Sequence, residues 1–438
     1  MKQNLNPRWF IVVVMFLFIL VHQTDMLMIN SLLKPIMETF SIGTEEMGFI
    51  ESGSLLVAAA LFPLWGFLYD RFSRAKLLGV ASLIWGSTTW LSAIAPTYPS
   101  FLAARAASGI DNSSYPGLYS LIADYFVPTM RSKIYGVLQL AQPLGYLLGM
   151  VLALTLGGML GWRNLFFATG AAGVVLAFVI FFGVRDAPRG KSEPEMQGLD
   201  NVGVFRFTLR HALDLFGKRG LLLMFAQGFA GVFPWNVITV WFLYYLETER
   251  FYTESERLLT MAPAVLFLAG GYFVGGLLGD ALFKRSVRGR VIVSLIGVLS
   301  GTVFLWLTMA VPMENKPLFF VLLCATALVI PFSSPNVVST VYDVTVPEVR
   351  ATALSIQYLI ENAGAATAPA LAGLLAARYG LHASILAICT VAWALCTVFL
   401  VGAVFLIPQD IRMLRRTMRE RAASLSAGAA AASAPETH

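Results

Sequence analysis

Long apolar segments alternate with short polar segments along almost the whole chain of 438 residues. A helix rises about 1.5 Å per residue, so about 20 mainly apolar residues cross the roughly 30 Å hydrocarbon layer of a membrane. We place twelve predicted spans at residues 9–36, 47–70, 75–96, 100–126, 132–160, 162–184, 219–246, 257–283, 290–312, 317–345, 350–378 and 382–407. The pattern therefore predicts an all-α membrane protein with twelve transmembrane helices. The first span is too long for the core of a signal peptide, and we expect it to be retained.

The longest polar connection separates the sixth span from the seventh. We expect residues 1–184 to form one six-helix bundle, 185–218 a linker, 219–408 a second six-helix bundle and 409–438 a tail. Val204, Phe207 and Leu209 fall near one helical stripe of the linker, which predicts an interfacial helix. The tail starts with closely spaced arginines and continues as an Ala/Ser stretch that we expect to be disordered.

An internal repeat supports two pseudo-symmetric halves. Asp124 to Arg131 closes the fourth span with the pattern D-x3-P-x2-R, and Asp343 to Arg350 closes the tenth span with the same pattern. Asp70 and Asp280 correspond at the ends of the second and eighth spans. Repeated halves of this kind place a substrate site between them, near the middle of the membrane.

Composition and charge narrow the class further. Hydrophobic residues make up 57% of the chain and charged residues 13%, which excludes an ordinary soluble enzyme. The formal net charge is +6, but the basic residues lie at helix ends and do not form a nucleic-acid-binding face. They gather in the even-numbered loops, so both termini are expected in the cytoplasm of a cell whose inner (plasma) membrane holds the protein.

The sequence offers no sign of an enzyme, a metal site or a cofactor. Cys324, Cys389 and Cys396 lie inside predicted spans without metal-ligand spacing. No GxxxxGK[ST], HExxH or GxSxG motif is present, so neither nucleotide-driven transport nor intramembrane catalysis is indicated.

The segment from Gly66 to Arg74 reads GFLYDRFSR. It resembles the G-x-L-x-D-R-x-x-R loop signature of the major facilitator superfamily, and the resemblance implies two six-helix bundles and secondary transport. The first half is most similar to the Spinster-type lipid transporter branch, through Asp25, Arg105 followed by SGIDNSSY, and VRDAPRG after the sixth span. Asn112 stands where that branch has an acidic residue, and Met26 where it usually has an arginine.

Ionisable side chains inside spans cost several kcal/mol, so each needs a partner, water or a task. The deep set consists of His22, Asp25, Glu51, Arg105, Asp111 and Glu361. We expect Asp25, Arg105 and Glu51 to form a titratable cluster on the cavity wall, where Arg105 takes an anionic group. The resemblance favours this role, and a permanent salt bridge between helices is the alternative.

The other deep groups each have two interpretations. His22 shares a face with Asp25 and is either a proton relay or a hydrogen-bonded structural group. Asp111 is a separate polar site or a packing group, and Glu361 is a coupling or substrate-amine contact or a packing group. Phe233 and Asn236 recur on one face of the seventh span, which could meet an amphipathic substrate or contact lipid.

The charges at the loop ends predict a gate. Asp70 is expected to cap the start of the eleventh span, and Arg71 or Arg74 to pair with Asp124. Arg131, Asp280, Asp343 and Arg350 occupy the repeated positions and complete the expected gate. Solvated topological charges are the alternative, although they do not account for Asp70.

These features predict a monomeric secondary active transporter that works by rocker-switch alternating access. The expected substrate is a small anionic, amphipathic or lipid-like solute, with protons as the favoured coupling ion and Na⁺ as the alternative. A drug efflux pump or an organic-anion importer of the same fold is a second possibility. A non-transporting membrane sensor or scaffold is a third.

Overall fold

The computed structural model describes residues 7–42, 44–196 and 209–432, and every regular element within them is helical. The first-half helices are α1 (Pro7–Met28), α2 (Leu33–Phe40), α3 (Thr44–Arg71), α4 (Arg74–Ile94), α5 (Tyr98–Ala107), α6 (Gly109–Asn112), α7 (Tyr115–Tyr125), α8 (Pro128–Leu160) and α9 (Trp162–Phe178). The remaining helices are α10 (Leu209–Leu213), α11 (Arg219–Thr248), α12 (Glu254–Arg285), α13 (Gly289–Ala310), α14 (Lys316–Val329), α15 (Ser333–Val344) and α16 (Arg350–Ala432). Short 3₁₀ segments lie between them: η1 (Ile29–Ser31), η3 (Pro194–Met196), η4 (Asp214–Gly217), η5 (Ile330–Phe332) and η6 (Pro347–Val349). The π-helical segment η2 (Val179–Gly183) continues α9.

Twelve spanning segments follow from these helices. Ten helices of the described residues are long and apolar enough to cross a membrane by length and composition. The fourth span is missing from that number because it is broken into α5, α6 and α7, and the eleventh and twelfth spans are merged in α16. The first predicted span, residues 9–36, extends too far, because α1 ends at Met28 and a 3₁₀ turn precedes α2.

The break in the fourth span has a local cause. The sequence from Ser108 to Ser114 is rich in residues whose side chains bond to nearby backbone. Ser108 donates to the carbonyl of Arg105 at 2.6 Å, and Ser113 donates to the carbonyl of Ile110 at 2.9 Å. These bonds compete with the regular helix ladder, so the segment turns inside the membrane where a continuous helix was expected.

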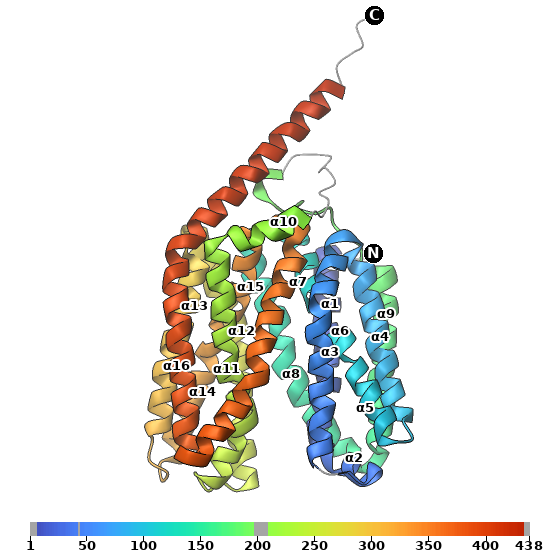
Figure 1. Cartoon of the computed structure of the whole chain (residues 1–438), viewed down its shortest axis with the longest axis vertical. Helices are drawn as coiled ribbons and strands as arrows, with labels where there is room; N and C mark the ends of the chain where they lie inside the picture. Colours follow the sequence, from blue (N-terminus) through green and yellow to red (C-terminus); the bar gives the residue numbers. More distant parts are fainter. Residues whose placement is uncertain (1–6, 43, 197–208, 433–438) are drawn as a thin grey trace, which may run out of the picture.

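Helix α16 contains two spans and most of the tail. Gly380 has φ 81° and ψ 164°, a conformation open to glycine, and it bends the chain between the eleventh and twelfth spans without a loop. Beyond the membrane the helix continues to Ala432 and projects from the body of the molecule (Figure 1). The described part of the tail, up to Ala432, is helical, which agrees with the preference of alanine and arginine for helix.

The described chain begins and ends on the same side of the bundle, which also holds residues 185–196 and α10 (Figure 1). We call this the linker side. Val204 and Phe207 of the expected interfacial helix lie outside the described residues, and the described part of the linker helix is α10, followed by η4. Leu213 and Phe216 are exposed there, at 61% and 52%.

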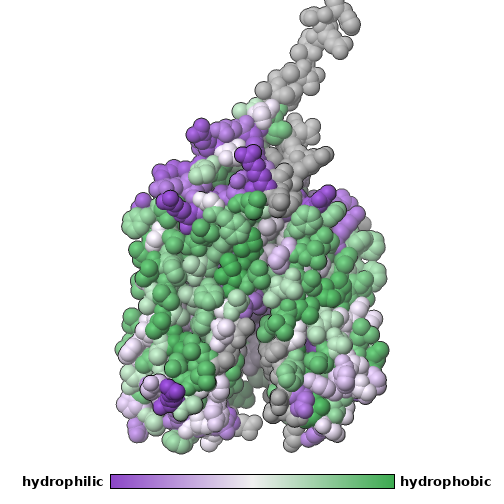
Figure 2. Space-filling view, viewed as in Figure 1, coloured by the Kyte–Doolittle hydropathy of each residue, from purple (hydrophilic) through white to green (hydrophobic). Residues whose placement is uncertain are grey.

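The two halves meet mainly through α8 against α12 and α3 against α16. Gly276 allows the first contact, because a Cβ at this position would collide with the carbonyl oxygen of Ser132. Charged and polar residues gather on the linker side, whereas a cleft separates the halves at the opposite end (Figure 2). The molecule is therefore closed on the linker side and open on the other.

Candidate functional site

Two aspartates on the linker side cap helices of the opposite half. Asp70, at the end of α3, accepts hydrogen bonds from the backbone N–H of Ala351 (3.2 Å) and Thr352 (2.7 Å) at the start of α16. Asp280, near the end of α12, accepts in the same way from Ser132 (3.2 Å) and Lys133 (2.7 Å), near the start of α8. The first turn of a helix carries partial positive charge and unpaired N–H groups, which a carboxylate satisfies. Each half thus caps the other.

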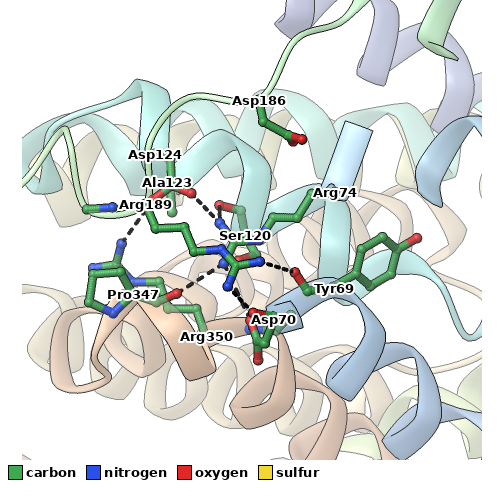
Figure 3. A network of polar contacts seen from close by, with 12 residues as sticks. Tyr69, Asp70, Arg74, Ser120, Ala123, Asp124, Asp186, Arg189, Pro347 and Arg350 are labelled. Atoms are coloured by element: carbon green, nitrogen blue, oxygen red, sulfur yellow. Dashed lines mark hydrogen bonds and ion pairs between the residues drawn. The ribbon is translucent and has the colours of Figure 1, made fainter. Parts of the chain in front are cut away.

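An arginine supports each capping aspartate. Arg74 pairs with Asp124, lies 3.4 Å from Asp70 and donates to the carbonyl of Pro347 at 3.0 Å (Figure 3). Arg71 stays outside this network: its side chain is exposed and its guanidinium lies 5.7 Å from the centre of the Phe67 ring.

The second half repeats this arrangement with Arg290. This arginine pairs with Asp343, lies 2.7 Å from Asp280 and donates to the carbonyl of Pro128. In the sequence, Arg290 looks like one more basic residue of an even-numbered loop, because it lies ten positions after Asp280 whereas Arg74 lies four positions after Asp70.

The arginines of the repeated D-x3-P-x2-R pattern connect the halves directly. Arg131 lies 3.5 Å from Asp343, and Arg350 lies 3.7 Å from Asp124. Glu193 of the linker binds both arginines, at 2.7 Å from Arg131 and in an ion pair with Arg350. Burial acts to raise the pKa of Glu193, but the two guanidinium groups outweigh it and lower this pKa to about 2. The role of Glu193 is not evident from the sequence, because a single glutamate in a polar linker belongs to no pattern.

The linker segment before Glu193 is fitted into the same network. Arg189 donates to the carbonyls of Asp70, Tyr69 (3.1 Å) and Phe72 (3.1 Å), which are the last carbonyls of α3 and the residue after it (Figure 3). Gly190 N–H donates to Asp124 at 3.0 Å. A Cβ at Gly190 would lie 2.9 Å from Pro347, so the chain passes there with little room. The linker is therefore part of the closure.

Asp25 is sealed inside the first half. It is 0% exposed and accepts hydrogen bonds from Trp85 (3.0 Å), Thr89 (2.9 Å) and Thr169 (2.6 Å). Arg105 Nη1 lies 3.7 Å from Asp25 Oδ2, so the structure brings these two side chains together. Asp25 was expected on a cavity wall, but its partners on α4 and α9 enclose the carboxylate in this structure. The structure does not describe the side chain of Glu51, the third member of the expected cluster.

His22 turns away from Asp25 toward the broken fourth span. Its Nε2 lies 2.6 Å from Asp111 Oδ2, and its Nδ1 lies 2.8 Å from the hydroxyl of Tyr115. Gln23 donates to the same hydroxyl at 3.1 Å. One consistent arrangement has Tyr115 donating to His22 and His22 donating to Asp111, so the four side chains form a hydrogen-bonded chain. Asn112, beside Asp111, is only partly buried.

A cavity of about 200 Å³ lies in the second half, and its wall includes Glu361, Gln227, Gln357 and Trp235. Phe233 and Asn236, for which contact with substrate and contact with lipid were both open, are not among its lining residues. The amide of Asn236 instead donates to the carbonyl of Val232 in its own helix at 2.8 Å. The face of α11 that lines the cavity therefore contains Gln227 and Trp235 and differs from the face of Phe233 and Asn236. Within the described residues, no group of three His, Cys, Asp or Glu side chains is placed to hold a metal.

Twelve spanning helices in two halves, closed against each other by reciprocal caps on one side and parted on the other, define a multi-pass membrane transport protein. The chain belongs to the Major Facilitator Superfamily, whose sequence profile matches residues 15–369. This confirms the family and the fold class indicated by the sequence.

The chain is also similar to individual proteins and to a solved structure. Protein spinster of Drosophila melanogaster is 26% identical over 380 residues, which cover 84% of this chain and 62% of that protein, so the chain spans less than two thirds of this relative. The probable sulfoacetate transporter SauU of Cupriavidus necator is 28% identical over 315 residues, covering 68% of this chain and 72% of that protein. The crystal structure of the human organic anion transporter MFSD10 (TETRAN) shares the fold, with a TM-score of 0.61, 17% identity and coverage of 92% of this chain and 99% of that one.

Proposed function

We propose that this chain is a secondary active transporter that moves a small organic anion by rocker-switch alternating access, coupled to protons. The observation that carries the proposal is the reciprocal closure of the linker side, where Asp70 caps α16 and Asp280 caps α8. Opening that side breaks both caps and separates the two arginines that Glu193 bridges. A closure with this many coupled contacts favours two discrete states over a continuum. Short basic loops favour the cytoplasmic side of a plasma membrane, which supports a cytoplasmic location for the linker side.

The proposed substrate class rests on Arg105 and on one relative. Arg105 is 4% exposed, and its Nε has no hydrogen-bond partner among the described residues. A guanidinium binds a carboxylate or sulfonate through its planar fork of donors. Sulfoacetate, the solute in the name of the relative from Cupriavidus necator, carries both groups. Protonation of Asp25 would release Arg105 from its 3.7 Å ion pair, so that proton uptake and anion binding occur together.

Flux into liposomes tests the proposal. The purified chain is reconstituted, and uptake of labelled sulfoacetate, cis,cis-muconate, a lysolipid and a cationic drug is measured with the membrane potential clamped. We expect a small anion to accumulate above its equilibrium level when a pH gradient is imposed. Accumulation driven by Na⁺ alone would contradict proton coupling, drug movement without anion movement would support an efflux pump, and binding without flux would support a sensor.

Asp25→Asn separates coupling from transport in the same liposomes. The variant cannot cycle a proton at this position, so we expect loss of accumulation while exchange of labelled for unlabelled anion continues. Asn keeps an acceptor for Trp85 and Thr89, and the thermal transition of the purified variant verifies folding. Unchanged accumulation in a folded variant would remove Asp25 from the coupling mechanism.

A further inference from the structure

The cavity of the second half contains one carboxylate without a cation. Glu361 lies on its wall and accepts a hydrogen bond from Gln357 Nε2 at 2.7 Å. It forms no ion pair with any residue that the structure describes. An ionised carboxylate inside a membrane protein is expensive unless a cation, water or a proton compensates it. Glu361 therefore has capacity for a positively charged partner.

Two amide oxygens on the same wall also lack donors. Gln227 and Gln357 are 6% and 2% exposed, and both line the cavity. The Oε1 atom of each has no hydrogen-bond partner within the described part of the chain. A buried acceptor left unpaired costs about 1–3 kcal/mol, so these oxygens favour a ligand that brings donors or positive charge.

Aromatic rings complete the wall. Trp235, Tyr272, Tyr358 and Trp393 all line the cavity. The faces of such rings are negative and attract ammonium ions, an interaction worth about 0.5–2 kcal/mol, whereas they have no comparable preference for carboxylates or sulfonates. The Tyr358 ring also lies 5.7 Å from that of Phe62 on α3, so the cavity borders the contact between the two halves.

We propose that this cavity binds a compact organic ammonium group, with Glu361 as its counter-ion, Gln227 and Gln357 as acceptors and the aromatic rings around it. The inference rests on the proposed function in one respect, since it makes the transported anion a zwitterion whose ammonium end enters the second half. The dimensions agree, because a cavity of about 200 Å³ accommodates a trimethylammonium or similar group.

Gly228 keeps the carboxylate in place. A Cβ at this position would lie 2.6 Å from Glu361 Oε1 and 3.3 Å from Gln357 Nε2. The absence of a side chain lets α11 approach α16 and leaves the carboxylate beside the amides. Gly228→Ala is therefore expected to displace Glu361 and weaken ammonium binding without removing any charge.

A matched pair of ligands tests the site in the purified full-length chain. Glycine betaine and 3,3-dimethylbutyrate have nearly the same shape and the same carboxylate, and differ by a quaternary nitrogen in place of a carbon. We expect betaine to bind about tenfold more tightly by calorimetry or thermal shift, which corresponds to about 1.4 kcal/mol from the ion pair and ring contacts. The preference for betaine should be lost in Glu361→Gln and persist in Glu420→Gln, which alters an exposed carboxylate on the tail.

The outcomes separate this site from the proposed function. Equal binding of the two ligands, or a betaine preference that survives in Glu361→Gln, would overturn the ammonium site. Stabilisation by Na⁺ over K⁺ that depends on Glu361 and excludes betaine would also overturn it, in favour of an inorganic ion site. Retained binding of dimethylbutyrate shows that Glu361→Gln is folded. These measurements need no flux, so charge-selective binding without transport would support the site and contradict only the proposed function.

Discussion

Glu193 shows how one side chain can hold two halves together. Arg131 and Arg350 belong to different halves and would repel each other at close range, and the carboxylate between them converts this repulsion into two ion pairs. Removing one partner of a buried ion pair typically costs about 3–5 kcal/mol, because it leaves an uncompensated charge. Glu193 is therefore a sensitive point of the closed state.

Its pKa predicts a pH dependence. The pKa of Glu193 is about 2 in the folded protein and 4.5 ordinarily, so its contribution is complete above pH 4.5 and is lost as pH falls toward 2. A difference of this size corresponds to about 3 kcal/mol. We expect Glu193→Gln to lower the thermal transition at pH 7, with a smaller difference from the native protein at pH 3.5. A difference that stays constant between these pH values, or an equal effect of Glu420→Gln, would contradict this role.

Individual residues differ in how far the sequence reveals them. The position of Asp70 at a helix junction, together with the repeat, predicts its cap on the eleventh span. The role of Arg290 is hidden, because α12 continues five residues beyond Asp280 whereas α3 ends one residue after Asp70, and the spacing that marks Arg74 is therefore absent. Trp235 is missed in favour of Asn236 because helical periodicity defines a face but not its rotation relative to neighbouring helices. Only packing against α16 fixes that rotation.

At the scale of elements, the tail of α16 and the linker form a second contact on the linker side. Met196 of η3 packs with Leu414 and Met418 of α16 in a small apolar cluster. Arg415 lies 3.2 Å from Glu195 of the linker, and Arg421 lies 2.7 Å from Glu348. Hydropathy predicts the spans themselves, because a helix of about twenty consecutive apolar residues matches the thickness of the hydrocarbon layer. Hydropathy does not predict that the twelfth span continues as a helix that packs against the linker.

Removing these contacts of the α16 tail should favour opening of the linker side. Partly exposed ion pairs contribute about 1 kcal/mol or less each, and together with the apolar cluster we expect deletion of residues 412–438 to shift the conformational ratio about tenfold. Deletion of residues 427–438 keeps all these contacts and is the control. Spin labels at Phe72 and Val287, both exposed on the linker side, report the distance between halves. Equal distance distributions for the two deletions would show that the tail does not stabilise closure.

At the scale of the whole molecule, closure is reciprocal. Asp70 reaches from the first half to the second, and Asp280 reaches back. A carboxylate at a helix N-terminus contributes up to about 2 kcal/mol in a buried setting. Because the two caps lie on separate helix pairs but oppose the same opening, their free energies should add.

Asparagine at either position should shift the population toward the state that is open on the linker side by about tenfold, and at both positions by about a hundredfold. Asp186→Asn is a matched control, since Asp186, at the start of the linker, accepts from the N–H of Ala75 at the start of α4 and so caps a helix of the first half without reaching the second half. The control should lower stability without changing the ratio of states. The same pair of spin labels measures the ratio, and a double variant no more open than either single variant would argue against independent caps.

The exchange of caps between halves has a genetic consequence. When a protein closes through contacts inside one unit, lesions are rescued by nearby changes in that unit. Here a loss at Asp70 weakens the start of α16, so spontaneous revertants selected for growth on the transported solute should carry second mutations among residues 347–352 as well as in α3. Revertants of Asp280 should carry second mutations among residues 128–133. The two sets of suppressor mutations would then identify the contact between the halves by genetics alone.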